Sequence, residues 1–233
     1  MKRLLQIFFP LAGVVLLGYI LSVSIGNNGG IAETFNSSDK QVLFYNLFKL
    51  AGLTAFTLLS YQIITGPFMR LWEKIYGDRF YLFHAWQGIF VLVFAVTHWI
   101  LIHVYMSFSN LSIPEFDALY EKPFIYFGPI ALILIFVTVV TAVLTVLLKW
   151  TKLEKIWWVH WINYIVFFMI FSHSLKIGSD IAYAESPLRP IWYAFFVVAV
   201  TGLLYRRVYV AFLKQTDEKS SLAGEGESYN KIV

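Results

Sequence analysis

The sequence predicts an all-α integral membrane protein folded as a bundle of six helices. Of its 233 residues, 59% are hydrophobic and only 14% are charged. The mean hydropathy of +0.68 is above that of ordinary soluble domains of this size. Six apolar segments are also long enough to cross a hydrocarbon core of about 30 Å, which takes about 20 residues of helix.

The six predicted helices follow one another along the chain and span residues 4–25, 41–64, 80–107, 124–148, 156–176 and 190–213. Lys2 and Arg3 precede the first segment as basic residues precede a signal peptide, but its apolar core is longer than the roughly 7–15 residues of a signal. We therefore expect it to be retained as the first helix. Residues 1–213 form the predicted transmembrane domain, and the polar residues 214–233 are expected to be a disordered cytoplasmic tail.

Basic residues predict the orientation of the bundle. The loops on one side of the predicted bundle carry more lysine and arginine than the loops on the other side. The residues on the more basic side are Lys2, Arg3, Arg70, Lys74, Arg79, Lys149, Lys152, Lys155, Arg206, Arg207 and Lys214. Such residues favour the cytoplasmic side, so we predict cytoplasmic termini and a location in the cell membrane, inner or plasma. The opposite loops carry acidic residues that we interpret as solvated charge, namely Glu33, Asp39, Glu115, Asp117, Glu121, Asp180 and Glu185.

The composition excludes several kinds of partner and site. The net charge of +4 comes from short loops and not from a basic stripe, so the expected partner is the lipid bilayer and not a nucleic acid. The sequence has no cysteine, which excludes iron-sulfur ligation by cysteine, thiolate-bound heme and covalent heme attachment through cysteine. No glycine-rich turn of a dinucleotide-binding fold is found. Any redox centre must therefore have other ligands.

Four histidines form two pairs inside the third and fifth predicted helices. His84 and His98 are fourteen residues apart, and His160 and His173 are thirteen apart, which separates each pair by roughly 20 Å along its helix. Ionisable residues are costly inside a bilayer and indicate function. Because imidazole is a good axial ligand of heme iron, we predict two b-type hemes between these helices. His84 and His160 would bind the inner heme, and His98 and His173 the outer one.

The spacing of each histidine pair sets the angle between its side chains. On an ideal helix, a side chain fourteen residues later points within about 40° of the first, and one thirteen residues later is offset by about 140°. The fifth helix must therefore bend, tighten or present its hemes at different angles.

Two further residues are candidates for heme binding. Gly88, one turn after His84, would let a porphyrin approach the backbone, or it packs two helices together. Arg79 is the first candidate for the inner-heme propionates, ahead of Arg70, Lys155, Arg206 and Arg207.

The sequence leaves the roles of His103 and Lys49 open. His103 lies five residues beyond His98 and is either a partly solvated interfacial residue or a residue that contacts an outer propionate, relays protons or lines an acceptor site. Lys49 lies in the outer half of the second helix. It either extends its amine to the interface or pairs with a propionate.

Two segments resemble the ferric reductase-like transmembrane domain superfamily. They are FHAWQGIFVLVFAVTH at residues 83–98, preceded by Arg79, and WWVHWINYIVFFMIFSH at residues 157–173. The superfamily includes NADPH oxidases, ferric-chelate reductases and the heme subunit of the periplasmic methionine sulfoxide reductase system. The resemblance covers roughly residues 41–210 and implies that all four histidines are heme ligands. The segment TGPFMRLWEKIYGDRF at residues 65–80 resembles the corresponding loop of the methionine sulfoxide reductase subunit.

The leading hypothesis is therefore a di-heme electron conduit, an oxidoreductase subunit without its own NAD(P)H and flavin domain. Electrons would come from a separate cytoplasmic flavoprotein or from quinol and pass from the inner to the outer heme. The extracytoplasmic acceptor would be ferric iron, oxygen, a quinone or a reductase. One alternative is a heme subunit that feeds a periplasmic reductase of the methionine sulfoxide type. Alternatives from other classes are a histidine-dependent proton-coupled transporter without heme and a heme-free scaffold that binds a divalent metal.

Overall fold

The structure, a computed structural model, describes residues 2–119, 122–146 and 161–208, and these form helices and loops without a strand. In chain order the elements are α1 (Lys2–Asn27), α2 (Ile31–Asn36), α3 (Lys40–Thr65), η1 (Gly66–Phe68), α4 (Met69–Tyr76), α5 (Arg79–Phe108), α6 (Ile113–Ala118), α7 (Phe124–Val146) and α8 (Ile162–Ile177), and a last helix at Arg189–Val208. The predicted all-α fold is confirmed for the described residues.

Five of these helices are long and apolar enough to span a membrane: α1, α3 together with α4, α5, α7 and the helix Arg189–Val208. The prediction of a multi-pass membrane bundle is therefore confirmed. Helix α8 is a sixth, shorter apolar helix of 16 residues, and the predicted start of this segment, residues 156–160, lies outside the described residues. So do residues 209–213 and the predicted tail, 214–233. The short elements α2, η1, α4 and α6 have no counterpart among the predicted helices.

Helix α3 lies at the centre of the bundle. It packs against α5 over much of its length and also contacts α1 and α8, while α7 packs against α8 and α5. At the middle of α3 the Phe56 ring stacks on Phe167 and on Trp192, with centroids 5.6 and 4.9 Å apart. Polar side chains of α3 bond to carbonyls one turn earlier, as a bilayer interior requires of buried hydroxyls; they are Thr54, Thr57 and Ser60.

Helix α1 is fastened to α3 and α4 by hydrogen bonds to backbone carbonyls. The Tyr61 hydroxyl donates to the carbonyl of Phe9 at 2.8 Å, and the Gln6 amide donates to the carbonyl of Ile75 at 2.6 Å. A Cβ atom at Gly13 would lie 3.2 Å from the Tyr61 ring, so glycine allows this close approach of the two helices. The first predicted segment thus packs as part of the bundle.

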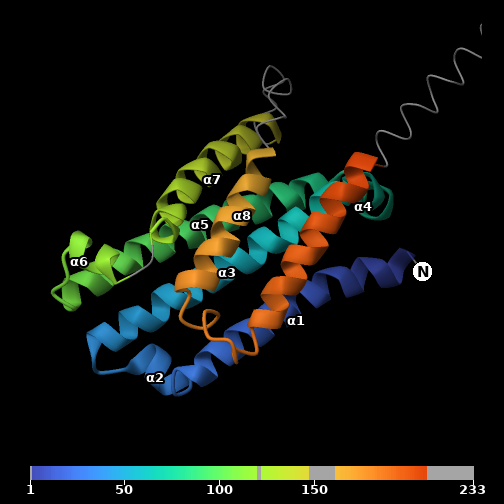
Figure 1. The fold of residues 1–233 in the computed structure, drawn as a ribbon. Helices are drawn as coiled ribbons and strands as arrows, with labels where there is room; N and C mark the ends of the chain where they lie inside the picture. The colour runs from blue at the N-terminus through green and yellow to red at the C-terminus, as the bar shows by residue number, and fades with distance from the viewer. Residues whose placement is uncertain (1, 120–121, 147–160, 209–233) are drawn as a thin grey trace, which may run out of the picture.

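The bundle has two distinct ends (Figure 1). The N-terminus of α1, α4 and the end of the last helix lie at one end, which we call the α4 end; α2 and α6 lie at the other, the α6 end. Basic residues predicted to be cytoplasmic lie on elements of the α4 end, namely Arg70 and Lys74 on α4, Arg79 at the start of α5, and Arg206 and Arg207 in the last helix. Which end faces the cytoplasm stays a prediction.

Candidate functional site

The imidazole of His98, on α5, is held by the backbone of α3. Its Nδ1–H donates a hydrogen bond to the carbonyl of Phe48 at 2.6 Å, and the Phe48 ring meets it edge-on with centroids 5.7 Å apart. A carbonyl only accepts, so the proton is on Nδ1 and Nε2 keeps its lone pair. Metal-binding histidines have this arrangement, in which a backbone carbonyl fixes one nitrogen and the other is the ligand.

The imidazole of His173, on α8, is held in the same way by α7. Its Nδ1–H donates to the carbonyl of Phe124, the first residue of α7, at 2.9 Å. The proton is again on Nδ1, and the Nε2 lone pair is available to a ligand. Two histidines from two helices therefore have the same tautomer, imposed by two other helices.

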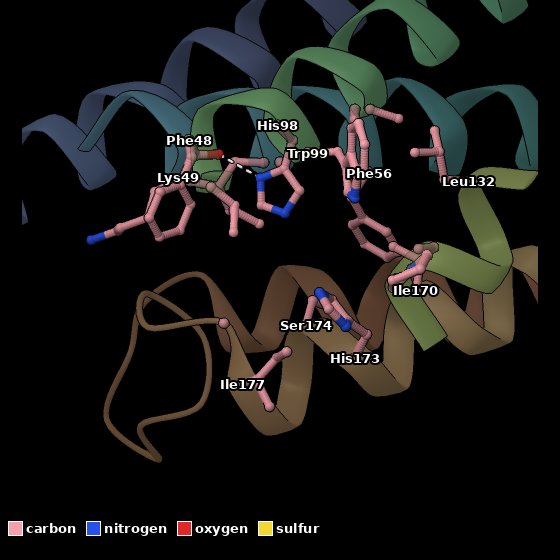
Figure 2. A pocket seen from close by; sticks show the side chains of 18 of the residues that line it. Phe48, Lys49, Phe56, His98, Trp99, Leu132, Ile170, His173, Ser174 and Ile177 are labelled. Atoms are coloured by element: carbon pink, nitrogen blue, oxygen red, sulfur yellow. Dashed lines mark hydrogen bonds between the residues drawn. The ribbon is translucent and has the colours of Figure 1, made fainter. Parts of the chain in front are cut away.

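Both histidines line one cavity of about 410 Å³, which we call the His98 cavity. In Figure 2, His98 extends from the upper helices and His173 from the lower one, on opposite sides of this space. The volume lies in the range of roughly 300–1,000 Å³ that is typical of small-molecule sites. The walls are mostly apolar and include Leu53, Phe56, Val91, Leu132, Ile170 and Trp192. The structure thus brings the predicted outer pair of ligands to a single cavity.

His84 lines a second cavity nearer the α4 end, of about 820 Å³, which we call the His84 cavity. The amide nitrogen of Gln62, on α3, donates to the carbonyl oxygen of His84 at 3.2 Å and lies 3.5 Å from Nε2 of its ring. The start of α8 borders the same cavity through Trp161, Asn163 and Tyr164. His160, the predicted partner of His84, lies outside the described residues, so the inner pair stays a prediction.

The two cavities share a wall. Leu59 of α3, Val91 of α5 and Ile135 of α7 line both of them. Val91 is 1% exposed and lies midway in sequence between His84 and His98. The two sites are therefore neighbours that three aliphatic side chains separate.

The other two predicted site residues lie on or near the His84 cavity. Gly88 lines it, and a Cβ atom there would lie 3.0 Å from the Gln62 amide nitrogen. Arg79 is exposed, and the basic side chains that line the cavity are instead Arg70, Lys74 and Arg206. The predicted contact of Arg79 with a propionate stays a prediction.

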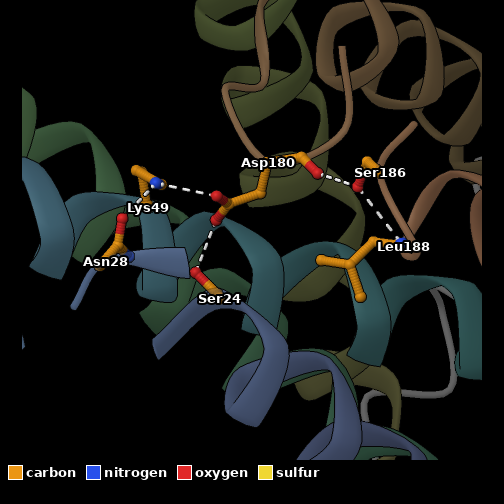
Figure 3. A network of polar contacts seen from close by, with 6 residues as sticks. All are labelled: Ser24, Asn28, Lys49, Asp180, Ser186 and Leu188. Carbon is orange, nitrogen blue, oxygen red and sulfur yellow. Dashed lines mark hydrogen bonds and ion pairs between the residues drawn. The ribbon is translucent and has the colours of Figure 1, made fainter. Parts of the chain in front are cut away.

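A buried ion pair lies on the wall of the His98 cavity (Figure 3). The Lys49 amine lies 2.9 Å from Oδ1 of Asp180, and these side chains are only 9% and 6% exposed. The amine also donates to Asn28 at 2.8 Å, and the Ser24 hydroxyl donates to Oδ2 of Asp180 at 2.5 Å. The Ser186 hydroxyl donates to the Asp180 carbonyl. The network joins α1, α3 and the segment after α8.

The expectation of solvated charge therefore fails for Asp180, because a lysine inside an apolar helix needs a counter-charge when it is buried. Neither alternative for Lys49 describes it fully, since its amine is withdrawn from solvent and already paired with a protein carboxylate. Glu115, by contrast, is exposed. Hydrogen bonds from the Ser112 hydroxyl and backbone N–H lower the pKa of its carboxyl.

His103 lines the His98 cavity beside His98 itself. Its Nδ1–H donates to the carbonyl of Trp99 at 2.9 Å, within α5, and its ring lies against the Trp99 ring with centroids 4.5 Å apart. His103 is partly exposed on the cavity wall, and its role stays a prediction. Among the residues that the structure describes, no group of three or more His, Cys, Asp or Glu side chains could hold a metal ion.

Sequence reasoning missed the groups that orient the two imidazoles. The available signal was a Phe-x-x-x-Gly pattern, which occurs at Phe48–Gly52 and Phe124–Gly128 and also at Phe9–Gly13, where it accompanies Tyr61. In the first two, the phenylalanine supplies a carbonyl to a histidine, and the glycine packs against that histidine ring. The partner of Lys49 was missed as well, although an aspartate just after the fifth segment was the available signal.

A family model described as ferric reductase like transmembrane component matches residues 51–171, which is more than half of the chain. The match covers the region of His84, His98 and His160 and ends two residues before His173. No curated protein and no solved structure matches the chain.

Replacement of Lys49 by methionine should destabilise the protein, because the Asp180 carboxylate would stay buried without its cation. We expect the free energy of unfolding in detergent to fall by about 3–5 kcal/mol, measured by thermal or SDS-induced unfolding. The double variant K49M/D180N should recover part of this loss. Lys40→Met, at the exposed start of α3, is the matched control, and equal stability of K49M and K40M would contradict the prediction.

Proposed function

The chain belongs to the family of ferric reductase-like transmembrane components, and on this premise we propose that it transfers electrons across a membrane by way of two b-type hemes. The observation that carries the proposal is the placement of His98 and His173 on opposite sides of one cavity, each with Nδ1 bonded to a carbonyl. His98 and His173 would hold the heme iron, and ligation by two histidines favours electron transfer over oxygen binding.

The residues of the His98 cavity fit a heme. Each of the two imidazoles offers an Nε2 lone pair, and the walls of the 410 Å³ cavity are mostly apolar, as sites for planar organic cofactors are. Bound heme iron would supply the one-electron change between its ferric and ferrous states. His98 and His173 would hold it, and side chains such as Phe56 and Trp192 would exclude water and so help to set its potential.

We propose the His84 cavity as the second heme site, with His84 and His160 as ligands. Support comes from the placement of His84 on the cavity wall and from the start of α8, directly after residue 160, on the same wall. Arg70, Lys74 and Arg206 also line this cavity. Their positive charges suit the carboxylates of heme propionates, because charge-assisted hydrogen bonds are among the stronger ones in proteins.

The positions of the two cavities suggest the direction in which an electron would cross the membrane. If the basic α4 end is cytoplasmic, the donor acts at the His84 cavity and the acceptor at the His98 cavity. We propose a separate flavoprotein or quinol as donor. The acceptor would be ferric iron, oxygen, a quinone or a reductase, including one of the methionine sulfoxide type, and His103 lines the cavity that it would approach.

The heme content of the purified protein tests this function. We expect two hemes per chain from the reduced absorption spectrum, one of which is lost in H98A, in H173A and in the double variant, because these two ligands serve one site. H84A and H160A should each lose the other heme. His103→Ala should retain both, since this residue is assigned no heme. A heme content near zero in the wild-type protein would contradict the proposal.

The basic residues of the His84 cavity should raise the potential of the heme proposed there, because a nearby positive charge favours the reduced, less positive iron. We expect Arg206→Gln to lower that potential by on the order of 60 mV, a tenfold change in the equilibrium of a one-electron couple, in a spectroelectrochemical titration. Arg79→Gln is the comparison variant. A shift in R79Q but not in R206Q would instead support the contact of Arg79 with a propionate.

A further inference from the structure

The two imidazoles of the His98 cavity are seated on their neighbouring helices in the same way. His98 bonds to the carbonyl of Phe48 on α3, and the ring rests on Gly52, four residues later. His173 bonds to the carbonyl of Phe124 on α7, and the ring rests on Gly128, again four residues later. The same residue types at the same spacing thus serve both histidines on two different helices.

Helix geometry explains the offset of four. The carbonyl of residue i points along the helix toward the N–H of residue i+4, so a ring that donates to this carbonyl from the side lies next to residue i+4. A Cβ atom at Gly52 would lie 2.9 Å from Nδ1 and 3.0 Å from Cε1 of His98. One at Gly128 would lie 3.0 Å from Cε1 and 3.4 Å from Nδ1 of His173. The shortest of these distances, 2.9 Å at Gly52 and 3.0 Å at Gly128, are both below normal van der Waals contact, and the one at Gly52 is the more severe.

We propose that Gly52 and Gly128 are positioning residues for the two histidines. Each leaves out the side chain that would push the ring off its carbonyl, and so keeps the proton on Nδ1 and Nε2 directed into the cavity. The role of Nε2 as a heme ligand rests on the proposed function. The seating of the rings is a property of the chain itself.

Other glycines of the described helices have different surroundings. A Cβ atom at Gly88 would meet the Gln62 amide. One at Gly13 would meet the ring of Tyr61, whose hydroxyl donates to the carbonyl of Phe9, so this glycine lies beneath a tyrosine and not a histidine. A Cβ atom at Gly18, in the middle of α1, would have nothing within 4 Å. Gly18 therefore provides a matched control, since Gly→Ala within a helix raises helix propensity by about 1 kcal/mol wherever it is made.

A purely structural role makes a different prediction. If Gly52 only allowed α3 and α5 to pack closely, alanine would lower stability but would leave the ring tautomer and the ligand strength unchanged. The test therefore needs readouts that report on the imidazole itself, in the full-length protein.

The experiment compares G52A and G128A with G18A in detergent micelles. In heme-free protein labelled with ¹⁵N-histidine, NMR reports which ring nitrogen carries the proton, with His98 and His173 assigned from their glutamine variants. We expect G52A to lose the fixed Nδ1–H form of His98, and G128A to weaken that of His173. After loading with heme, G52A should lose about 10-fold to 100-fold in affinity at this site, as changes to groups that orient a ligand do, and G128A less. G18A should match the wild type.

The outcomes separate this inference from the proposed function. If G52A and G128A retain the wild-type tautomers, the positioning role is overturned, whatever their stability. If the wild-type protein binds no heme, the proposed function fails, and the tautomers in the heme-free variants still decide the role of the glycines. Should G52A fail to fold, G128A, which has the milder contact, gives the deciding measurement.

Discussion

A polar ring atom inside a bilayer has no water to bond to, and this constraint organises the protein around His98 and His173. Each imidazole has two nitrogens, and the fold provides a partner for one of them by directing it to a helical carbonyl. A backbone carbonyl can accept a second hydrogen bond without leaving its own helix. The remaining nitrogen then faces the cavity, so the cost of burying an imidazole is offset while its ability to bind a ligand is kept.

Helix α3 is the element on which both cavities depend, although it carries none of the four paired histidines. Its residues include the carbonyl that holds His98, the glycine beneath that ring, and the Gln62 amide that donates to the carbonyl of His84. It also carries Lys49, whose ion pair with Asp180 joins α3 to the segment after α8 on the wall of the His98 cavity. The helices that bear ligands are thus arranged around a central helix that positions them.

Much of the architecture could be predicted from the sequence, because long apolar segments and matched histidine depths are local signals. The bundle and the placement of His98 and His173 on one cavity follow from them. The groups that orient the rings could not be predicted so directly, because a carbonyl is present at every residue and only packing decides which one faces a histidine. The same holds for Asp180, whose burial depends on a lysine over one hundred residues earlier. Arg79 was favoured by its closeness in sequence, whereas Arg70 and Arg206 reach the cavity from other helices.

The wall of Leu59, Val91 and Ile135 between the cavities affects how much work the transfer of a charge across the membrane would involve. Aliphatic side chains offer neither water nor an ion a group to bind, so an electron transferred between the proposed hemes would cross this wall without a compensating ion. Moving one elementary charge across a potential of 100 mV involves about 2.3 kcal/mol. If the chain transfers electrons as proposed, each transfer would therefore depend on the membrane voltage, and the rate would respond to the energetic state of the cell.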